Sequence, residues 1–236
     1  MANVDTRTDS PAPAPTVRVG LAVAAMAVVF AALLFVPAGR WDWALGWFYL
    51  GIIVVSVVIN WACLRRWNPE LIERRMRLGE GTKTWDKVWA VLMAPVMIAV
   101  YVVAGLEARD GLSSLPSVQW PLGMVIFVPG ETLLIWSMVV NPFFEKTVRI
   151  QTDRGHRVID TGPYAYVRHP GYVGFAGWLL SAPLLLGSVW AFVPALLAVI
   201  GIVIRTALED RTLQAELAGY PTYAARVRFR LIPGIW

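Results

Sequence analysis

Long uninterrupted stretches of apolar residues set the strongest limit on how this chain can fold. The first, residues 17–36, is about as long as the roughly 20 residues with which an α-helix crosses the hydrocarbon core of a bilayer. Three stretches of similar length follow, at residues 43–63, 88–106 and 120–140. Because backbone polar groups in lipid must be paired within the segment, each stretch is predicted to be a transmembrane helix.

The last apolar stretch, residues 172–204, is too long for one span and tight for two. Gly187 and Ser188 lie near its centre, with Pro183 and Pro194 on either side. We expect two shortish helices that turn at Gly187-Ser188, because prolines would interrupt the alternative, a single long tilted helix. The predicted fold is an all-α integral membrane protein with four transmembrane helices and a C-terminal helical hairpin.

Composition agrees with a membrane protein. Of the 236 residues, 57% are hydrophobic and 16% are charged, whereas a soluble domain carries about 25% charged residues. Cys63 is the single cysteine, which excludes an internal disulfide and a thiolate metal cluster. His156 and His169 have no companion ligands in the sequence, so no metal site is predicted.

The basic residues indicate the orientation of the spans. The connections 37–42 and 107–119 hold only Arg40 and Arg109, whereas nineteen of the twenty-one Lys and Arg residues lie in the other loops and near the termini. By the positive-inside rule, both termini and the loops 64–87 and 141–170 are cytoplasmic in a multi-pass protein of the cell inner membrane. Topology thus explains the net charge of +5, and no nucleic-acid partner is predicted.

The chain divides into three predicted regions. Residues 1–16 form a disordered lead-in, residues 17–140 hold the four spans, and residues 141–236 form a third region with a cytoplasmic loop, the hairpin and the C-terminal segment. Within the second region, the loop 64–87 is predicted to contain an amphipathic helix that starts at Asn68-Pro69. Within the third, the apolar residues on both sides of Asp153-Arg154-Gly155 predict a small hairpin.

Two polar clusters flank the terminal hairpin. The first is the run Gly162-Pro-Tyr-Ala-Tyr-Val-Arg-His-Pro-Gly-Tyr-Val-Gly174, in which tyrosines and an Arg-His pair stand beside the apolar stretch. The second begins with Glu209 and Asp210, where that stretch ends, and continues to Arg230. Carboxylates at the edge of the bilayer need a partner, and the hairpin would bring the two clusters together.

These residues resemble a known family. The core Arg-His-Pro-x-Tyr-x-Gly is similar to the signature of the membrane-embedded methyltransferases, which include isoprenylcysteine carboxyl methyltransferase and the phospholipid N-methyltransferases. The tail matches it in the acidic pair Glu209-Asp210, where the family commonly has two glutamates, and in the tyrosines and the final Ile232-Pro233-Gly234. The resemblance covers roughly residues 141–236, and the first two spans carry no motif.

The resemblance implies S-adenosylmethionine as methyl donor, bound in a pocket formed by the cytoplasmic loops, the hairpin and a C-terminal helix. The residues expected to bind this cofactor are Tyr164, Tyr166, Val167, Arg168, His169, Pro170, Tyr172, Gly174, Glu209 and Asp210.

The chemistry of these side chains suits that donor. An arginine such as Arg168 can pair with its carboxylate, and Glu209 or Asp210 with its ammonium group or ribose diol. The tyrosine rings can contact adenine or the sulfonium. His169 has three readings: a hydrogen bond to the cofactor, a brace for the loop, or a general base.

The acceptor is predicted to be a lipophilic molecule or lipid that enters from the bilayer. A carboxylate acceptor needs no base, and a cation such as Arg228 or Arg230 would position it; Tyr223 completes the candidate catalytic residues. An amine or a thiol acceptor stays open at this point. No sequence feature specifies an oligomeric state.

Two other functions are compatible with the sequence. Membrane sterol reductases, which use a nicotinamide cofactor, resemble this C-terminal architecture, but their signature has Arg-His without the following proline. A transporter or scaffold would predict charges within the first four spans. Glu131 is such a charge, and its position near the start of its predicted span favours a role in helix entry.

Overall fold

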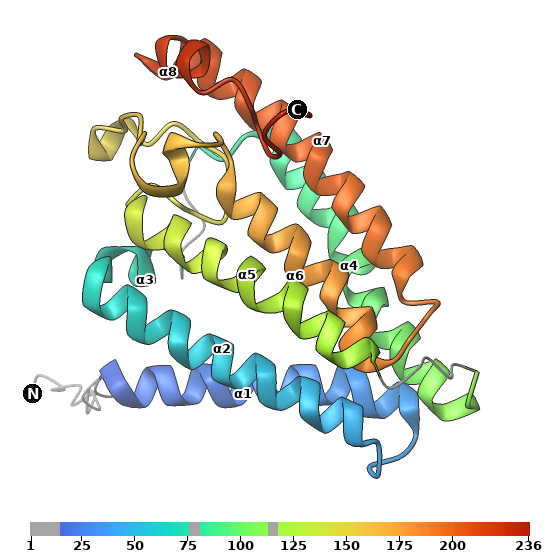
Figure 1. The fold of residues 1–236 in the computed structure, drawn as a ribbon. Helices are drawn as coiled ribbons and strands as arrows, with labels where there is room; N and C mark the ends of the chain where they lie inside the picture. The colour runs from blue at the N-terminus through green and yellow to red at the C-terminus, as the bar shows by residue number, and fades with distance from the viewer. Residues whose placement is uncertain (1–14, 76–80, 113–117) are drawn as a thin grey trace, which may run out of the picture.

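The computed structural model describes residues 15–75, 81–112 and 118–236, and the described part of the chain is all helical with no strand. Five of its helices are long and apolar enough to cross a membrane. Figure 1 shows these five helices packed in a bundle together with the shorter apolar helix α6. The long helices of the bundle are α1 (Pro15–Ala38), α2 (Ala44–Trp67), α4 (Thr84–Asp110), α5 (Gln119–Val140) and α7 (Phe192–Glu216).

The predicted fold class is confirmed. Each of the four predicted spans corresponds to one of the helices α1, α2, α4 and α5, and only the second predicted span, 43–63, begins outside its helix, by one residue. The last apolar stretch folds as a hairpin of α6 (Pro170–Leu186) and α7, and it turns at Gly187, which has a left-handed φ of 72°. The predicted lead-in falls largely on residues 1–14, which lie outside the described part of the chain, and α1 already begins at Pro15.

The turn between α6 and α7 is held in place by hydrogen bonds to Glu107 of α4. The buried carboxylate of Glu107 accepts a hydrogen bond from the hydroxyl of Ser188 and another, of 3.0 Å, from the backbone nitrogen of Trp190. These bonds satisfy polar groups at the start of α7 that have no partner within the helix. The turn therefore has a fixed position against α4 at the end of the bundle opposite the large loops.

Helices α5 and α6 make the most extensive contact in the bundle (Figure 1). Their backbones meet at Gly130 and Gly174, where a Cβ atom added to Gly174 would lie 2.5 Å from the carbonyl oxygen of Gly130. Small residues allow such close packing in lipid, where water does not drive helices together. Gly174 thus allows α6 to pack closely against α5.

Glu131 does not lie at the start of its span. It is the thirteenth residue of the 22-residue helix α5, and its carboxylate accepts a hydrogen bond from the hydroxyl of Ser56 on α2. The expected role in helix entry is therefore wrong. The pair links α2 and α5 in the middle of the bundle, which satisfies a carboxyl group at that depth.

The two large loops compare differently with their predictions. In the first, α3 (Pro69–Arg75) begins at the predicted proline, and its Leu71 is fully buried. The part of the prediction that falls on residues 76–80 lies outside the described residues. In the second, a 3-10 turn at Thr152–Arg154 replaces the predicted hairpin. The backbone of Val148 pairs instead with Lys83 and the Asp86 side chain.

Candidate active site

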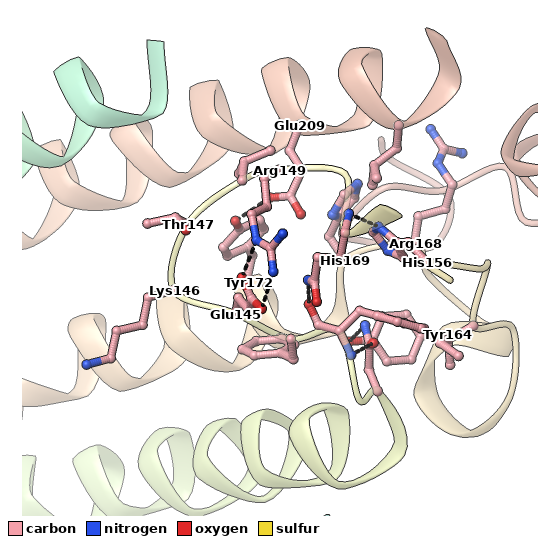
Figure 2. Close-up of a pocket in the computed structure, with 18 of the residues that line it drawn as sticks. Glu145, Lys146, Thr147, Arg149, His156, Tyr164, Arg168, His169, Tyr172 and Glu209 are labelled. Atoms are coloured by element: carbon pink, nitrogen blue, oxygen red, sulfur yellow. Dashed lines mark hydrogen bonds and ion pairs between the residues drawn. The ribbon is translucent and has the colours of Figure 1, made fainter. Parts of the chain in front are cut away.

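A cavity of about 390 Å³ lies where the large loops meet the ends of the helices. This volume is within the range of about 300–1,000 Å³ that is usual for small-molecule sites. Its wall combines side chains of α4, α5 and α7, the segment between α5 and α6, the first residues of α6, Arg75 of α3, and Tyr220 and Tyr223 near the C-terminus. Figure 2 shows the side chains that converge there.

A buried carboxylate behind the cavity ties the two predicted polar clusters together. Asp210 of α7 is fully buried, and its two oxygens accept hydrogen bonds of 2.7 and 3.0 Å from Nε and Nη2 of Arg168. Such a bidentate ion pair compensates the cost of removing both charges from water. The predicted meeting of the clusters is therefore realised, in the form of a contact between two protein groups.

Four further side chains contact the carboxylate of Asp210. Its oxygens accept hydrogen bonds from the Tyr220 hydroxyl at 2.9 Å, Gln214 Nε2 at 2.7 Å and Arg230 Nε at 2.8 Å, and Nε2 of His169 lies 3.3 Å away. These partners come from α7, from α8 (Tyr220–Arg226), from the C-terminal tail and from the segment before α6. Asp210 is thus the centre of a network that joins four parts of the chain.

The backbone reinforces this junction. Nη1 of Arg168 donates to the carbonyl oxygens of Val227 and Arg228, both at 2.7 Å. The backbone nitrogens of Arg168 and His169 donate to Phe229 and Arg230 at 3.0 and 2.9 Å. The Arg-His segment and the C-terminal tail therefore run side by side and are joined by hydrogen bonds.

Two aromatic rings and a carboxylate face the cavity itself. The hydroxyl of Tyr172 donates a hydrogen bond to Glu209 of α7, and the Tyr172 ring stacks on the ring of His169 with centroids 5.8 Å apart (Figure 2). All three residues line the cavity. The arrangement offers a negative charge and aromatic faces to a cationic ligand.

A second ion pair lies next to Tyr172 in the cavity wall. Nε of Arg205 lies 2.8 Å from Asp86, and the Arg205 guanidinium stands 4.6 Å above the ring of Trp89 and 5.5 Å from the ring of Tyr172. Asp86 is buried and also accepts a 2.8 Å hydrogen bond from the backbone nitrogen of Val148. This pair fixes the loop after α5 against α4 and α7.

The loop after α5 contributes a third pair and a histidine. Arg149 contacts both oxygens of Glu145, at 2.8 and 3.0 Å, and also Asp153, and these hydrogen bonds raise the pKa of Arg149. The ring of His156 lies 4.5 Å from that of Phe143. Burial, helped by the charge of Arg149, lowers the pKa of His156 from 6.5 to about 4, so His156 is neutral at pH 7.

Not all predicted cofactor residues reach the cavity. Those in its wall are Tyr164, Arg168, His169, Tyr172 and Glu209.

The other five predicted cofactor residues lie elsewhere. Tyr166 is 70% exposed, and Val167 is buried outside the wall. Pro170 begins α6, Gly174 packs against α5, and Asp210 stands behind Arg168.

Of the three predicted catalytic residues, one lies in the cavity wall and two lie outside it. Tyr223 lines the cavity, and its hydroxyl donates a 2.7 Å hydrogen bond to the carbonyl oxygen of Tyr164. Arg228 is exposed and outside the wall. Arg230 is also outside it, because its guanidinium is held between Asp210 and the ring of Trp236.

Sequence reasoning missed several residues of the wall. These are chiefly Arg75, Trp89, Glu145, Arg149 and His156. The sequence did indicate one ion pair, because Glu145 and Arg149 carry opposite charges and lie four positions apart. Arg75 gave no signal, since nothing in the sequence places α3 beside the later loop. Among the described residues, no group of three or more His, Cys, Asp or Glu side chains is arranged to hold a metal.

Comparison with known proteins confirms the resemblance in the part of the chain that forms most of the wall. Residues 122–215 match the model of the isoprenylcysteine carboxyl methyltransferase family. A segment of 45 residues is 44% identical to a protein-S-isoprenylcysteine O-methyltransferase of Schizosaccharomyces pombe, and this segment is 19% of this chain and 19% of that relative. These matches favour a methyltransferase over the reductase, transporter and scaffold alternatives.

The fold has a known counterpart. A solved structure of the eukaryotic intramembrane Ras methyltransferase, isoprenylcysteine carboxyl methyltransferase, aligns over 94% of this chain and 88% of that chain with a TM-score of 0.50. The two sequences are 17% identical, so the similarity concerns the fold. An integral, multi-pass membrane architecture follows for this chain.

Proposed function

We propose that this protein transfers a methyl group from S-adenosylmethionine to a lipophilic acceptor at the cytoplasmic face of the cell inner membrane, with both termini in the cytoplasm. One observation carries the proposal: the match to the methyltransferase family, residues 122–215, spans α5, the following loop, α6 and nearly all of α7, which form most of the cavity wall. The catalytic region proposed here is residues 141–236, completed by side chains from α3, α4 and α5.

The wall suits this donor in size and chemistry. Glu209 is a carboxylate for its ammonium group or ribose diol, and the rings of Tyr172, His169 and Tyr164 are surfaces for its adenine and sulfonium. When bound, the donor supplies an activated methyl group. Arg168 acts as a positioning residue in this proposal, because its pairing with Asp210 keeps the Arg-His segment in place.

The acceptor enters from the lipid side. Met97, Leu134 and Phe175 belong to α4, α5 and α6 and give the wall an apolar part next to the membrane spans. Methyl transfer from an activated donor mainly requires that the acceptor atom be held close and in line. The polar part of the wall would hold the donor, while the apolar part aligns the acceptor chain.

Calorimetric titration into detergent-purified protein tests the proposal. S-adenosylmethionine and its demethylated product should bind saturably, Glu209→Gln should weaken both, and NADPH should not bind. Tyr166→Phe is the matched control, because this exposed tyrosine lies outside the wall. Binding of NADPH without binding of either methyl-donor compound would overturn the proposal in favour of a reductase.

A further inference from the structure

The cavity wall contains five arginines, and most of them have an acidic partner. Three pair with a carboxylate: Arg149 with Glu145, Arg168 with Asp210 and Arg205 with Asp86, at 2.8, 2.7 and 2.8 Å.

The other two arginines of the wall are Arg75 and Arg157. Arg157 is exposed, so water solvates its charge. Arg75 is part-buried, and no Asp or Glu of the described residues lies within 4.0 Å of its guanidinium.

Arg75 is the last residue of α3 and extends into the wall from the first half of the chain. Its Nη1 donates a 3.2 Å hydrogen bond to the carbonyl oxygen of Phe144, and its guanidinium stands 5.6 Å from the Phe144 ring. A guanidinium carries five N–H groups, so this bond occupies one of five donors. The aromatic contact orients the planar fork, and the guanidinium makes no other hydrogen bond to a residue that the structure describes.

The surroundings of Arg75 are unfavourable to a positive charge. Burial, and then the charge of Arg205, lower the pKa of Arg75. An arginine nevertheless remains protonated at neutral pH, because its ordinary pKa lies far above 7. A desolvated charge without a counter-ion costs free energy, and bound anions supply that counter-ion in functional sites.

We propose that Arg75 binds a carboxylate group of the ligand inside the cavity. The inference rests on the proposed function, which offers two sources of a carboxylate: the amino-acid part of the methyl donor, or the acceptor itself. Arg228 and Arg230, the cations expected from the sequence, stand outside the wall, and Arg75 takes over their anticipated role. The planar fork of arginine matches a carboxylate in two hydrogen bonds.

Binding measurements on Arg75→Gln in detergent-purified protein test the proposal and separate the two sources. The first arm titrates S-adenosylmethionine and its decarboxylated analogue. The second arm titrates N-acetyl-S-farnesylcysteine, a lipophilic carboxylic acid, and its methyl ester. Loss of a charged hydrogen-bond partner should weaken the carboxylate ligand on the order of tenfold to hundredfold. The ligand that lacks the carboxylate should bind the variant and the unmodified protein equally.

The ligand whose affinity falls in Arg75→Gln identifies the source of the carboxylate. Weaker binding confined to S-adenosylmethionine assigns Arg75 to the donor, and weaker binding confined to the farnesylated acid assigns it to the acceptor. Unchanged binding of both carboxylate ligands overturns the inference. If S-adenosylmethionine fails to bind the unmodified protein, the proposed function fails, and the second arm still decides the role of Arg75.

Two control variants distinguish the loss of a carboxylate contact from a general effect on folding or charge. Arg74→Gln removes the same charge from the neighbouring, exposed position of α3 outside the cavity, and should leave all four affinities unchanged. Arg75→Lys keeps the charge without the planar fork, and should weaken the carboxylate ligand less than Arg75→Gln does. An equal loss in Arg74→Gln would show that the overall charge of α3, rather than Arg75, is responsible.

Discussion

Both oxygens of Asp210 are held by the guanidinium of Arg168, at 2.7 and 3.0 Å, although the two residues lie 42 positions apart in the chain. The pair is buried, and α8 and the C-terminal tail each contribute a further partner of Asp210, Tyr220 and Arg230. An arginine that the sequence assigns to a cofactor thus also holds the end of the protein together. Variants of this residue therefore report on folding as well as on binding.

The first prediction concerns this network. Asp210→Asn should lower the free energy of unfolding by about 3–5 kcal/mol, because Arg168 would be left buried without a counter-ion. Thermal unfolding in detergent measures the change. Glu216→Gln is the matched control: its partner Lys83 is on the surface, so its loss should cost at most about 1 kcal/mol. Equal effects of the two variants would contradict the assignment.

Tyr172→Phe should raise the dissociation constant of S-adenosylmethionine several-fold while the fold is kept. The substitution removes the hydroxyl that donates to Glu209, so this carboxylate is no longer held in place. Titration calorimetry measures the constant. Tyr166→Phe removes the same group from an exposed ring and should change nothing; a comparable loss there would argue against the role of Tyr172.

Gly174→Ala should destabilise the protein by about 1–3 kcal/mol, because the new methyl group would lie 2.5 Å from the carbonyl oxygen of Gly130 and push α5 and α6 apart. Gly51→Ala offers the comparison, since a Cβ atom at that helix position meets nothing within 4 Å. There, replacement of a helical glycine should be neutral or stabilising by up to about 1 kcal/mol. Unfolding temperatures of both variants decide the point.

The fourth prediction concerns the stability of the folded protein at low pH. Because the pKa of His156 is lowered from 6.5 to about 4 in the folded protein, the unfolded chain binds an extra proton between these values. Stability should therefore fall as the pH is lowered from about 6.5 to 4, by at most about 1.4 kcal/mol per pH unit from this residue. Unfolding measured from pH 4 to 7.5 should show a shallower slope for His156→Gln. Identical slopes would mean that His156 has an ordinary pKa.

Orientation in the membrane is directly measurable. A reporter fused after Trp236 should be found in the cytoplasm, because nineteen of the twenty-one basic residues lie in the loops and terminal segments of that side. The same reporter inserted after Gly111, between α4 and α5, should be found on the outer face. The opposite pair of results would invert the proposed topology and place the cavity outside.

The sequence predicts the fold well because apolar length and helix-breaking residues are local signals. The spans and the hairpin turn at Gly187 follow from them. The loop after α5 does not, because its conformation depends on distant partners: Val148 hydrogen-bonds to Asp86 rather than to a neighbouring strand. Glu131 was misinterpreted for a different reason: the predicted span 120–140 already places it near the middle, and only its partner Ser56 on α2 could not be read from the sequence.

The candidate site was predicted in part. The motif located Tyr164, Arg168, His169, Tyr172 and Glu209, all of which line the cavity. A motif does not state which of its side chains point at a ligand and which support their neighbours. Nor does it include residues such as Arg75, which reach the cavity only through the packing of α3.

Helix α7 runs for 25 residues from Phe192 to Glu216, from the hairpin turn to the wall of the cavity (Figure 1). A single residue inserted midway would rotate everything beyond it by about 100° and advance it by about 1.5 Å. Glu209 would then turn away from Tyr172, and Asp210 from Arg168, in one step. The number of residues between the turn and the carboxylates is therefore constrained, and α7 should tolerate substitutions on its lipid-facing side far better than any change in length.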